Sequence, residues 1–292
     1  MITPLSSPLP LIQNNSCIDP ERVTKIFISG FNRDVNAEES KGFISTYLYK
    51  GGLNVIYLDW AEEAKQGNWV VLGYIRAVIN TEKVANQLAT ALMTLSGAGL
   101  NLDKVHVIGH SLGAQISGIT GSKVRSEGGV IARVTALDPA KPLYEGLLTI
   151  KQGVNNDSAK FVDVIHSDPG GYGISESAGT ADFWPNYEDK PGLQQQPGCP
   201  SRPAPLLSDE SLCSHVRSVV YFLESITICD CFLAAGEPNY ETWIQNNGES
   251  NSTAYMGEYV SLDARGNYYL VTNDRPPYSK GQDGTNPKNR VS

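Results

Sequence analysis

The sequence has no apolar run long enough to span a membrane. The most apolar stretch, around Val70 to Ile79, is short and is interrupted by Arg76, whereas a spanning helix needs about 20 apolar residues. Low-complexity tracts and internal repeats are also missing, and 9% of the residues are aromatic, which excludes a disordered chain. The sequence therefore predicts a folded protein with no transmembrane segment.

Basic clusters are missing as well. Lys and Arg are scattered singly in a chain of net charge −8. A protein that reads nucleic acid displays basic clusters against the phosphate backbone, so we expect no nucleic-acid partner. Only 18% of the 292 residues are charged and 40% are hydrophobic. That composition allows one large core, and the length alone allows one or two domains.

The five cysteines include no two CxxC pairs, which argues against a zinc module. Three N-x-S/T acceptors occur, at Asn14, Asn156 and Asn251. Cysteines, acceptors and few charges together favour an exported glycoprotein. No signal peptide precedes Pro4, so we expect a mature or trimmed form.

Short β-branched runs alternate with helical patterns along the first half of the chain. Strands separated by helices need crossover connections, which predicts an α/β fold with a mostly parallel central sheet and helices on both faces. The predicted strands are 23–29, 54–60, 104–109, 133–137 and 160–165, and the predicted helices are 81–95, 112–119 and 215–228.

Three later regions show weaker patterns. Residues 168–214 are rich in Gly, Pro, Ser and Asp and show no periodic element, which is typical of a lid or of surface loops. Residues 236–269 are polar and rich in Tyr, which indicates antiparallel strands or irregular cover. The tail at 279–292 has almost no apolar residues, so we expect it to be frayed.

The run from Gly109 to Gly113 fits the G-x-S-x-G motif, with Ser111 at its centre. A predicted strand ends at Gly109 and a predicted helix begins at Leu112, which is the strand–turn–helix context of a nucleophile elbow. The glycines are needed because the serine lies in a strained turn. The helix N-terminus offers N–H groups to an anion that forms beside the serine. We therefore interpret Ser111 as a nucleophile.

A serine nucleophile needs a base, and the chain has only four histidines. His106 lies inside a predicted strand and His110 lies in the elbow itself. Of the remaining two, His215 opens a helix after the long irregular region, whereas His166 follows a continuous strand, and a residue at a strand end is more often packed or hydrogen-bonded. We therefore prefer His215 as the base.

The acid that orients the base is expected at Asp138, just past an apolar strand and before Pro139. The order Ser111, Asp138, His215 is the chain order of α/β-hydrolases. Asp163 is the rival acid, but it lies in the middle of a strand.

These residues resemble the pancreatic-type lipase family over most of the chain. The resemblance is carried by seven runs, at 54–60, 107–115, 136–140, 160–166, 182–186, 213–215 and 270–277. It implies an α/β-hydrolase fold, the triad Ser111–Asp138–His215, an oxyanion hole from the backbone N–H groups of Phe31 and Leu112, lipid esters as substrates and an extracellular location. Some members have a separate C-terminal lipid-interface domain, and we expect none here. Ser111, Asp138 and His215 must come together in one active site, so we expect a single domain over 1–292.

The resemblance also implies a lid closed by a disulfide between Cys199 and Cys213. Only Pro200 to Leu212 lies between these cysteines, and the loop from Asp168 to Asp182 is abbreviated. A short lid and a short loop resemble the phospholipase A1 branch, including its insect members. The family's acidic calcium ligands are not matched between Leu147 and Ser158, so we expect no metal and no other cofactor.

The sequence departs from the family pattern at three places. Ser29 replaces a histidine before Gly30-Phe31, and Thr180 replaces another. The family's cysteine pair after the last predicted helix is not matched; Cys229 and Cys231 occur instead, and the pairing of Cys17, Cys229 and Cys231 is open. These departures keep open the hypothesis of a lipase-fold binding or storage protein, similar to yolk proteins. A neutral-lipid lipase is also compatible with the motifs, and a thioesterase or generic esterase of the same fold fits the triad but not the lid cysteines.

Overall fold

A computed structural model describes residues 1–13, 17–65, 67, 69–189, 194–200, 204–228 and 231–291. They divide into two compact units. The first unit consists of Met1–Ala136 with Ile150–Val162, and the second of Leu137–Thr149 with Asp163–Ser292. The single domain expected from the sequence stays a prediction. No described helix is both long and apolar enough to cross a membrane.

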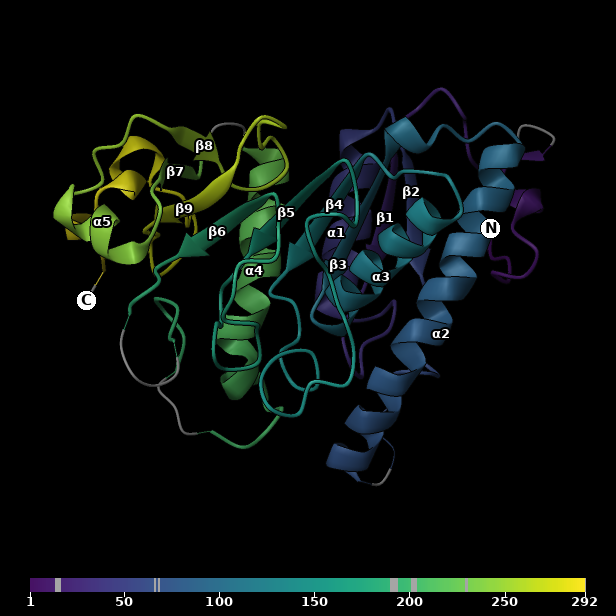
Figure 1. Cartoon of the computed structure of the whole chain (residues 1–292), viewed down its shortest axis with the longest axis horizontal. Helices are drawn as coiled ribbons and strands as arrows, with labels where there is room; N and C mark the ends of the chain where they lie inside the picture. Colours follow the sequence, from purple (N-terminus) through teal and green to yellow (C-terminus); the bar gives the residue numbers. More distant parts are fainter. Residues whose placement is uncertain are drawn as a thin grey trace. The chain divides into compact units, whose positions relative to one another are not determined.

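The first unit contains a parallel sheet with the strand order β2-β1-β3-β4 (Figure 1). β1 (Thr24–Ile28) pairs in parallel with β2 (Asn54–Leu58) on one side and with β3 (Val105–His110) on the other. β4 is Arg133–Leu137. Because parallel strands end at the same edge, the segments after β1 and β3 lie close together.

Helices cover both faces of this sheet. Successive side chains of a strand point to opposite faces, and Phe27 on β1 stacks on Phe43 of α1 (Glu38–Lys50) with ring centroids 3.9 Å apart. The next residue, Ile28, is in register with Gly109. A Cβ at Gly109 would collide with α3 (Leu112–Ser126), so α3 lies on the face opposite α1. α2 (Val70–Gly97) packs against α3.

The second unit has a mixed sheet in the order β5-β6-β9-β7-β8 (Figure 1). β6 pairs in parallel with β5 and β9, whereas β7 runs antiparallel to β9 and β8. The strands are β5 (Phe161–Ile165), β6 (Ala181–Pro185), β7 (Leu233–Gly236), β8 (Thr253–Tyr255) and β9 (Gly266–Leu270), and the helices are α4 (Asp209–Thr227) and α5 (Tyr240–Gln245).

The predicted mostly parallel sheet with helices is confirmed, and some expectations about elements need correction. The irregular region expected at 168–214 contains β6 and the start of α4. β6 is buried at all five positions, so it has none of the alternation by which a strand is recognised. α2 begins at Val70, eleven residues before the expected Thr81. α1 and α5 were not predicted.

The expectation of a frayed tail is wrong. Residues Gly281–Thr285 and Pro287–Asn289 form 3₁₀ turns. The carbonyl of Gly284 accepts from Val271 N at 2.8 Å, and that of Thr285 accepts from the buried indole Nε1 of Trp243 at 2.8 Å. Backbone carbonyl groups hold this polar segment in place, and such hydrogen bonds cannot be inferred from its amino-acid composition.

Deletion of residues 281–292 is expected to lower the free energy of unfolding by about 2–4 kcal/mol, because it leaves the Trp243 N–H without its acceptor and exposes apolar surface. Urea unfolding followed by tryptophan fluorescence measures the loss. Deletion of residues 291–292 alone is the control and should change little. Equal stability of the two deletions would mean that the tail does not support the core.

Candidate active site

Ser111 lies at the turn between β3 and α3 and has a left-handed backbone, with φ 58° and ψ −120°. A serine in this region of φ is strained, and the strain persists only where the surroundings fix it. A Cβ at Gly113 would collide with the carbonyl oxygen of Ile28 at the end of β1. The glycines of the motif therefore let the elbow pack against its own strand and the neighbouring one.

The loop after β1 lies beside this serine. A Cβ on Gly30 would lie 2.9 Å from the Ser111 Cβ. Ser29 accepts through its carbonyl from Trp60 Nε1 at 2.9 Å, and its hydroxyl lies 2.9 Å from the Tyr57 hydroxyl. These bonds fix the segment before Phe31 although the family's histidine is replaced by Ser29.

Asp138 and His215 are in direct contact. His215 Nδ1 lies 2.6 Å from Asp138 Oδ2, where the imidazole N–H donates to the carboxylate. The second oxygen, Oδ1, accepts from the backbone N–H groups of Ser167 and Asp168 at 2.7 and 2.8 Å. Asp138 is completely buried and His215 is 3% exposed. A carboxylate that accepts three N–H groups is fixed in orientation and stays charged at low energetic cost.

The backbone around Asp138 is shaped for this contact. Asp138 has a left-handed φ of 41°. A Cβ on Gly173 would lie 2.5 Å from the Asp138 carboxylate, so only glycine leaves room for it. Ser167 connects acid and base, because its N–H donates to Asp138 and its hydroxyl donates to the His215 carbonyl at 3.3 Å.

A second buried His–Asp pair lies in the same unit. His166 Nε2 is 2.8 Å from Asp182 Oδ1, and that oxygen also accepts from Ala178 N and Gly179 N. The His166 ring stacks on Trp184 at 3.7 Å and has no exposed surface. Its chain order, His before Asp, differs from the α/β-hydrolase order.

The structure brings the predicted residues together in two groups. Ser111, Leu112 and Phe31 belong to the first unit, and Asp138 and His215 to the second. Within each group the residues are neighbours, as expected from the sequence. The assembly of both groups into one triad, and the role of each residue, stay predictions.

The predicted disulfide between Cys199 and Cys213 is present, with the Cα atoms 5.7 Å apart. Of the segment that it closes, residues 204–208 are described and form no helix or strand before α4. The hydroxyl of Tyr172 accepts from Leu207 N at 3.1 Å and lies 3.1 Å from Ser211 Oγ. Cys17 and Cys231 are not paired, and Cys229 lies outside the described residues.

Sequence reasoning missed the residues that support the acid and base. Asp168 and Tyr172 lie in the region 168–214 that was expected to be irregular, and Ser167 directly precedes it; the ring centroid of Tyr172 is 5.5 Å from that of His215. The available signal was the position of this segment after the strand that ends at Ile165. Ser167 and Asp168 bind Asp138 Oδ1 through backbone N–H groups, which every residue type except proline can supply, so the sequence does not reveal them.

One cluster of three candidate metal ligands occurs among the described residues, namely Asp138, Asp168 and His215, whose ligand atoms lie within 4.8 Å of one another. Hydrogen bonds already occupy several atoms of these groups. Asp138 binds His215, and Asp168 Oδ2 accepts from Tyr172 N at 3.0 Å. The arrangement fits an acid–base pair, and the absence of a metal stays a prediction.

Comparison with known proteins assigns the chain to a family. The sequence model of the family "Lipase" matches residues 11–278. "Lipase member H" of Xenopus tropicalis is 40% identical over 190 residues, which are 64% of this chain and 38% of that protein. "Pancreatic triacylglycerol lipase" of Sus scrofa is 31% identical over 293 residues, covering 91% of this chain and 62% of that protein.

The chain belongs to the lipase family. It spans less than two thirds of the length of these two relatives. Among solved structures, a putative hydrolase of the α/β superfamily from Xanthomonas campestris covers 49% of this chain at 16% identity and a TM-score of 0.35, a likeness too distant to support any conclusion.

Replacement of both cysteines, Cys199→Ser and Cys213→Ser, is expected to lower the free energy of unfolding by about 2–3 kcal/mol, because the bond closes a short loop in the unfolded chain. Chemical denaturation measures the change. The single replacement Cys231→Ser is the control, since Cys231 forms no disulfide. An unchanged midpoint in the double variant would contradict a stabilising disulfide.

Proposed function

We propose that the chain is a secreted carboxylic ester hydrolase that acts on lipids. Its activity resembles that of a phospholipase A1, which releases a fatty acid from a glycerophospholipid. The proposal rests mainly on the bond between Asp138 and His215, which prepares an imidazole as a base. Membership of the lipase family and the left-handed turn at Ser111 support it.

The first half of the reaction transfers the acyl group to the enzyme. His215 Nε2 takes the proton of the Ser111 hydroxyl, and the oxygen attacks the carbonyl carbon of the ester. The developing oxyanion receives hydrogen bonds from the backbone N–H groups of Phe31 and Leu112. The proton on His215 then passes to the departing alcohol oxygen, which leaves as the lysolipid.

The second half regenerates the enzyme. Water gives a proton to His215 Nε2 and attacks the acyl-serine, so the fatty acid is released and Ser111 recovers its proton. Asp138 remains ionised throughout and stabilises the imidazolium. Because acid, base and nucleophile serve one reaction, we also propose that both units form a single domain.

The short segment between Cys199 and Cys213 supports phospholipid as substrate. The described residues 204–208 of that segment form no helix, α4 begins at Asp209, and the Tyr172 hydroxyl accepts a hydrogen bond from Leu207 N in the segment. A small cover leaves room for a polar headgroup. A disulfide is also what an oxidising, extracellular environment permits, which supports secretion.

An organophosphonate ester is expected to form an adduct on Ser111, because the activated hydroxyl attacks phosphorus as it attacks a carbonyl. Mass spectrometry of peptides locates the adduct. Ser111→Ala should abolish both the adduct and ester turnover, whereas Ser126→Ala, at the exposed end of α3, should retain both. A wild-type chain that neither reacts nor releases acid from esters would support a binding or storage protein.

His215→Ala is expected to lower turnover by about 10³-fold or more, since the serine loses its base. His166→Ala is the matched control, because it removes the second buried His–Asp pair. Its turnover per folded molecule, with folding measured by circular dichroism, should fall far less. A larger loss in His166→Ala would reassign the base.

Phosphatidylcholine should be cleaved faster than triglyceride in mixed micelles, because a short cover admits a charged headgroup. Fatty-acid release measures both rates at equal ester concentration. Cleavage at the outer position of the glycerol should dominate if the activity is of the A1 type. Faster release from triglyceride would favour a neutral-lipid lipase.

A further inference from the structure

A cavity of about 370 Å³ lies within the second unit, on its C-terminal half. Its lining includes no residue of the proposed triad and neither cysteine of the disulfide. Cavities of this size hold small organic molecules or the headgroup of a larger one. Its walls combine aromatic rings with acidic side chains: Trp184, Tyr187, Tyr240, Tyr269, Asp189 and Glu241.

The aromatic side chains form one continuous wall. The ring centroid of Tyr187 lies 5.3 Å from that of Trp184, 5.4 Å from that of Tyr240 and 6.5 Å from that of Tyr269. Each aromatic ring carries a negative potential on its face. Tyr187 and Tyr240 are partly exposed at the cavity, whereas Trp184 and Tyr269 are each 5% exposed and support them from the core.

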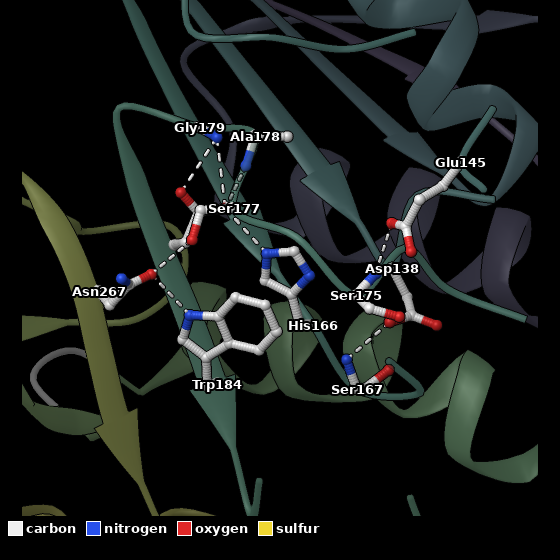
Figure 2. Close-up of polar contacts among 11 residues, drawn as sticks. Asp138, Glu145, His166, Ser167, Ser175, Ser177, Ala178, Gly179, Trp184 and Asn267 are labelled. Atoms are coloured by element: carbon white, nitrogen blue, oxygen red, sulfur yellow. Dashed lines mark hydrogen bonds and ion pairs between the residues drawn. The ribbon is translucent and has the colours of Figure 1, made fainter. Parts of the chain in front are cut away.

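Contacts with His166 and Asn267 fix the position of Trp184. One face of its indole stacks on the His166 ring, and its Nε1 donates to Asn267 Oδ1 at 2.9 Å. Figure 2 shows this bond together with a second bond to Asn267 Oδ1, which the Ser177 hydroxyl donates at 2.7 Å. A wall held in this way needs little reordering when a ligand binds, and this favours affinity.

The described residues that line the cavity carry only negative charge. Asp189 and Glu241 are exposed there, and no Lys, Arg or His is among the described lining residues. Neither carboxylate forms an ion pair with another described residue. Burial raises the pKa of Tyr187, and the Asp189 carboxylate raises that pKa further. The field of this carboxylate therefore reaches into the aromatic wall.

We propose that this cavity binds an organic ammonium group of the choline type. Such a cation is attracted to aromatic faces within about 6 Å of the ring centroid, and the two carboxylates add attraction. A neutral sugar could stack on the same rings but would gain nothing from the charge. The ammonium group could belong to a free small molecule or to a phospholipid headgroup, which are separate arms of the test.

Isothermal titration with choline tests the site, and saturable binding with a Kd below about 10 mM is expected. The neutral isostere 3,3-dimethyl-1-butanol has the same shape without the charge and should bind at least about fivefold more weakly. Added salt should weaken choline binding, because the carboxylates are exposed. Equal binding of the two compounds, tighter binding of a neutral sugar, or no binding of choline would overturn the proposal.

Two pairs of variants assign the binding to this cavity. Asp189→Asn should weaken choline binding at least about threefold, whereas Asp263→Asn, at an exposed acid outside the cavity, should not. Tyr240→Leu should weaken binding similarly, whereas Tyr259→Leu should not. Circular dichroism confirms that each variant is folded. Unchanged affinity in both cavity variants would contradict the assignment.

Vesicles distinguish the two sources of the ammonium group. Diether lipids resist ester hydrolysis, so binding is measured without turnover and independently of the proposed esterase activity. Binding to diether phosphatidylcholine vesicles that free choline displaces, and that Asp189→Asn weakens, identifies the headgroup as ligand. Choline binding without such displacement identifies a free ammonium compound.

Discussion

The bond between His215 and Asp138 is the interaction on which the proposed chemistry depends. A histidine acts as a base toward serine only if its other nitrogen carries the proton, and a carboxylate at 2.6 Å fixes that tautomer. A buried carboxylate is itself costly unless it is hydrogen-bonded. The N–H groups of Ser167 and Asp168 meet this cost. The two carboxylate oxygens of Asp138, at the end of β4, therefore bind both the loop at Ser167 and Asp168 and the α4 residue His215.

The surroundings of this bond are built from backbone as much as from side chains. Asp138 adopts a left-handed φ, Gly173 leaves space for the carboxylate, and Ser167 also holds the carbonyl of His215. Ser111 shows the same principle in the first unit, where glycines allow a strained turn. In both units, unusual backbone geometry lies at the residues that the proposed reaction uses.

Strong periodicity made much of the fold predictable. The strand at 133–137 and the helix that begins at Leu112 were located from residue pattern alone. Prediction failed where neighbours decide the structure. β6 has no alternation because it is buried on both faces, and the polar tail is ordered by acceptors for Trp243 and Val271. The glycine motif and histidine elimination selected Ser111 and His215, but the backbone donors to Asp138 have no sequence signature.

The most direct test of the central claim is a crystal structure of the phosphonate-treated protein. The account predicts phosphorus bonded to Ser111 Oγ, a phosphonyl oxygen within hydrogen-bond distance of the N–H groups of Phe31 and Leu112, and His215 Nε2 beside Oγ with its Nδ1 still on Asp138. A Ser111 adduct with His215 remote from it, or with another histidine in its place, would contradict the account.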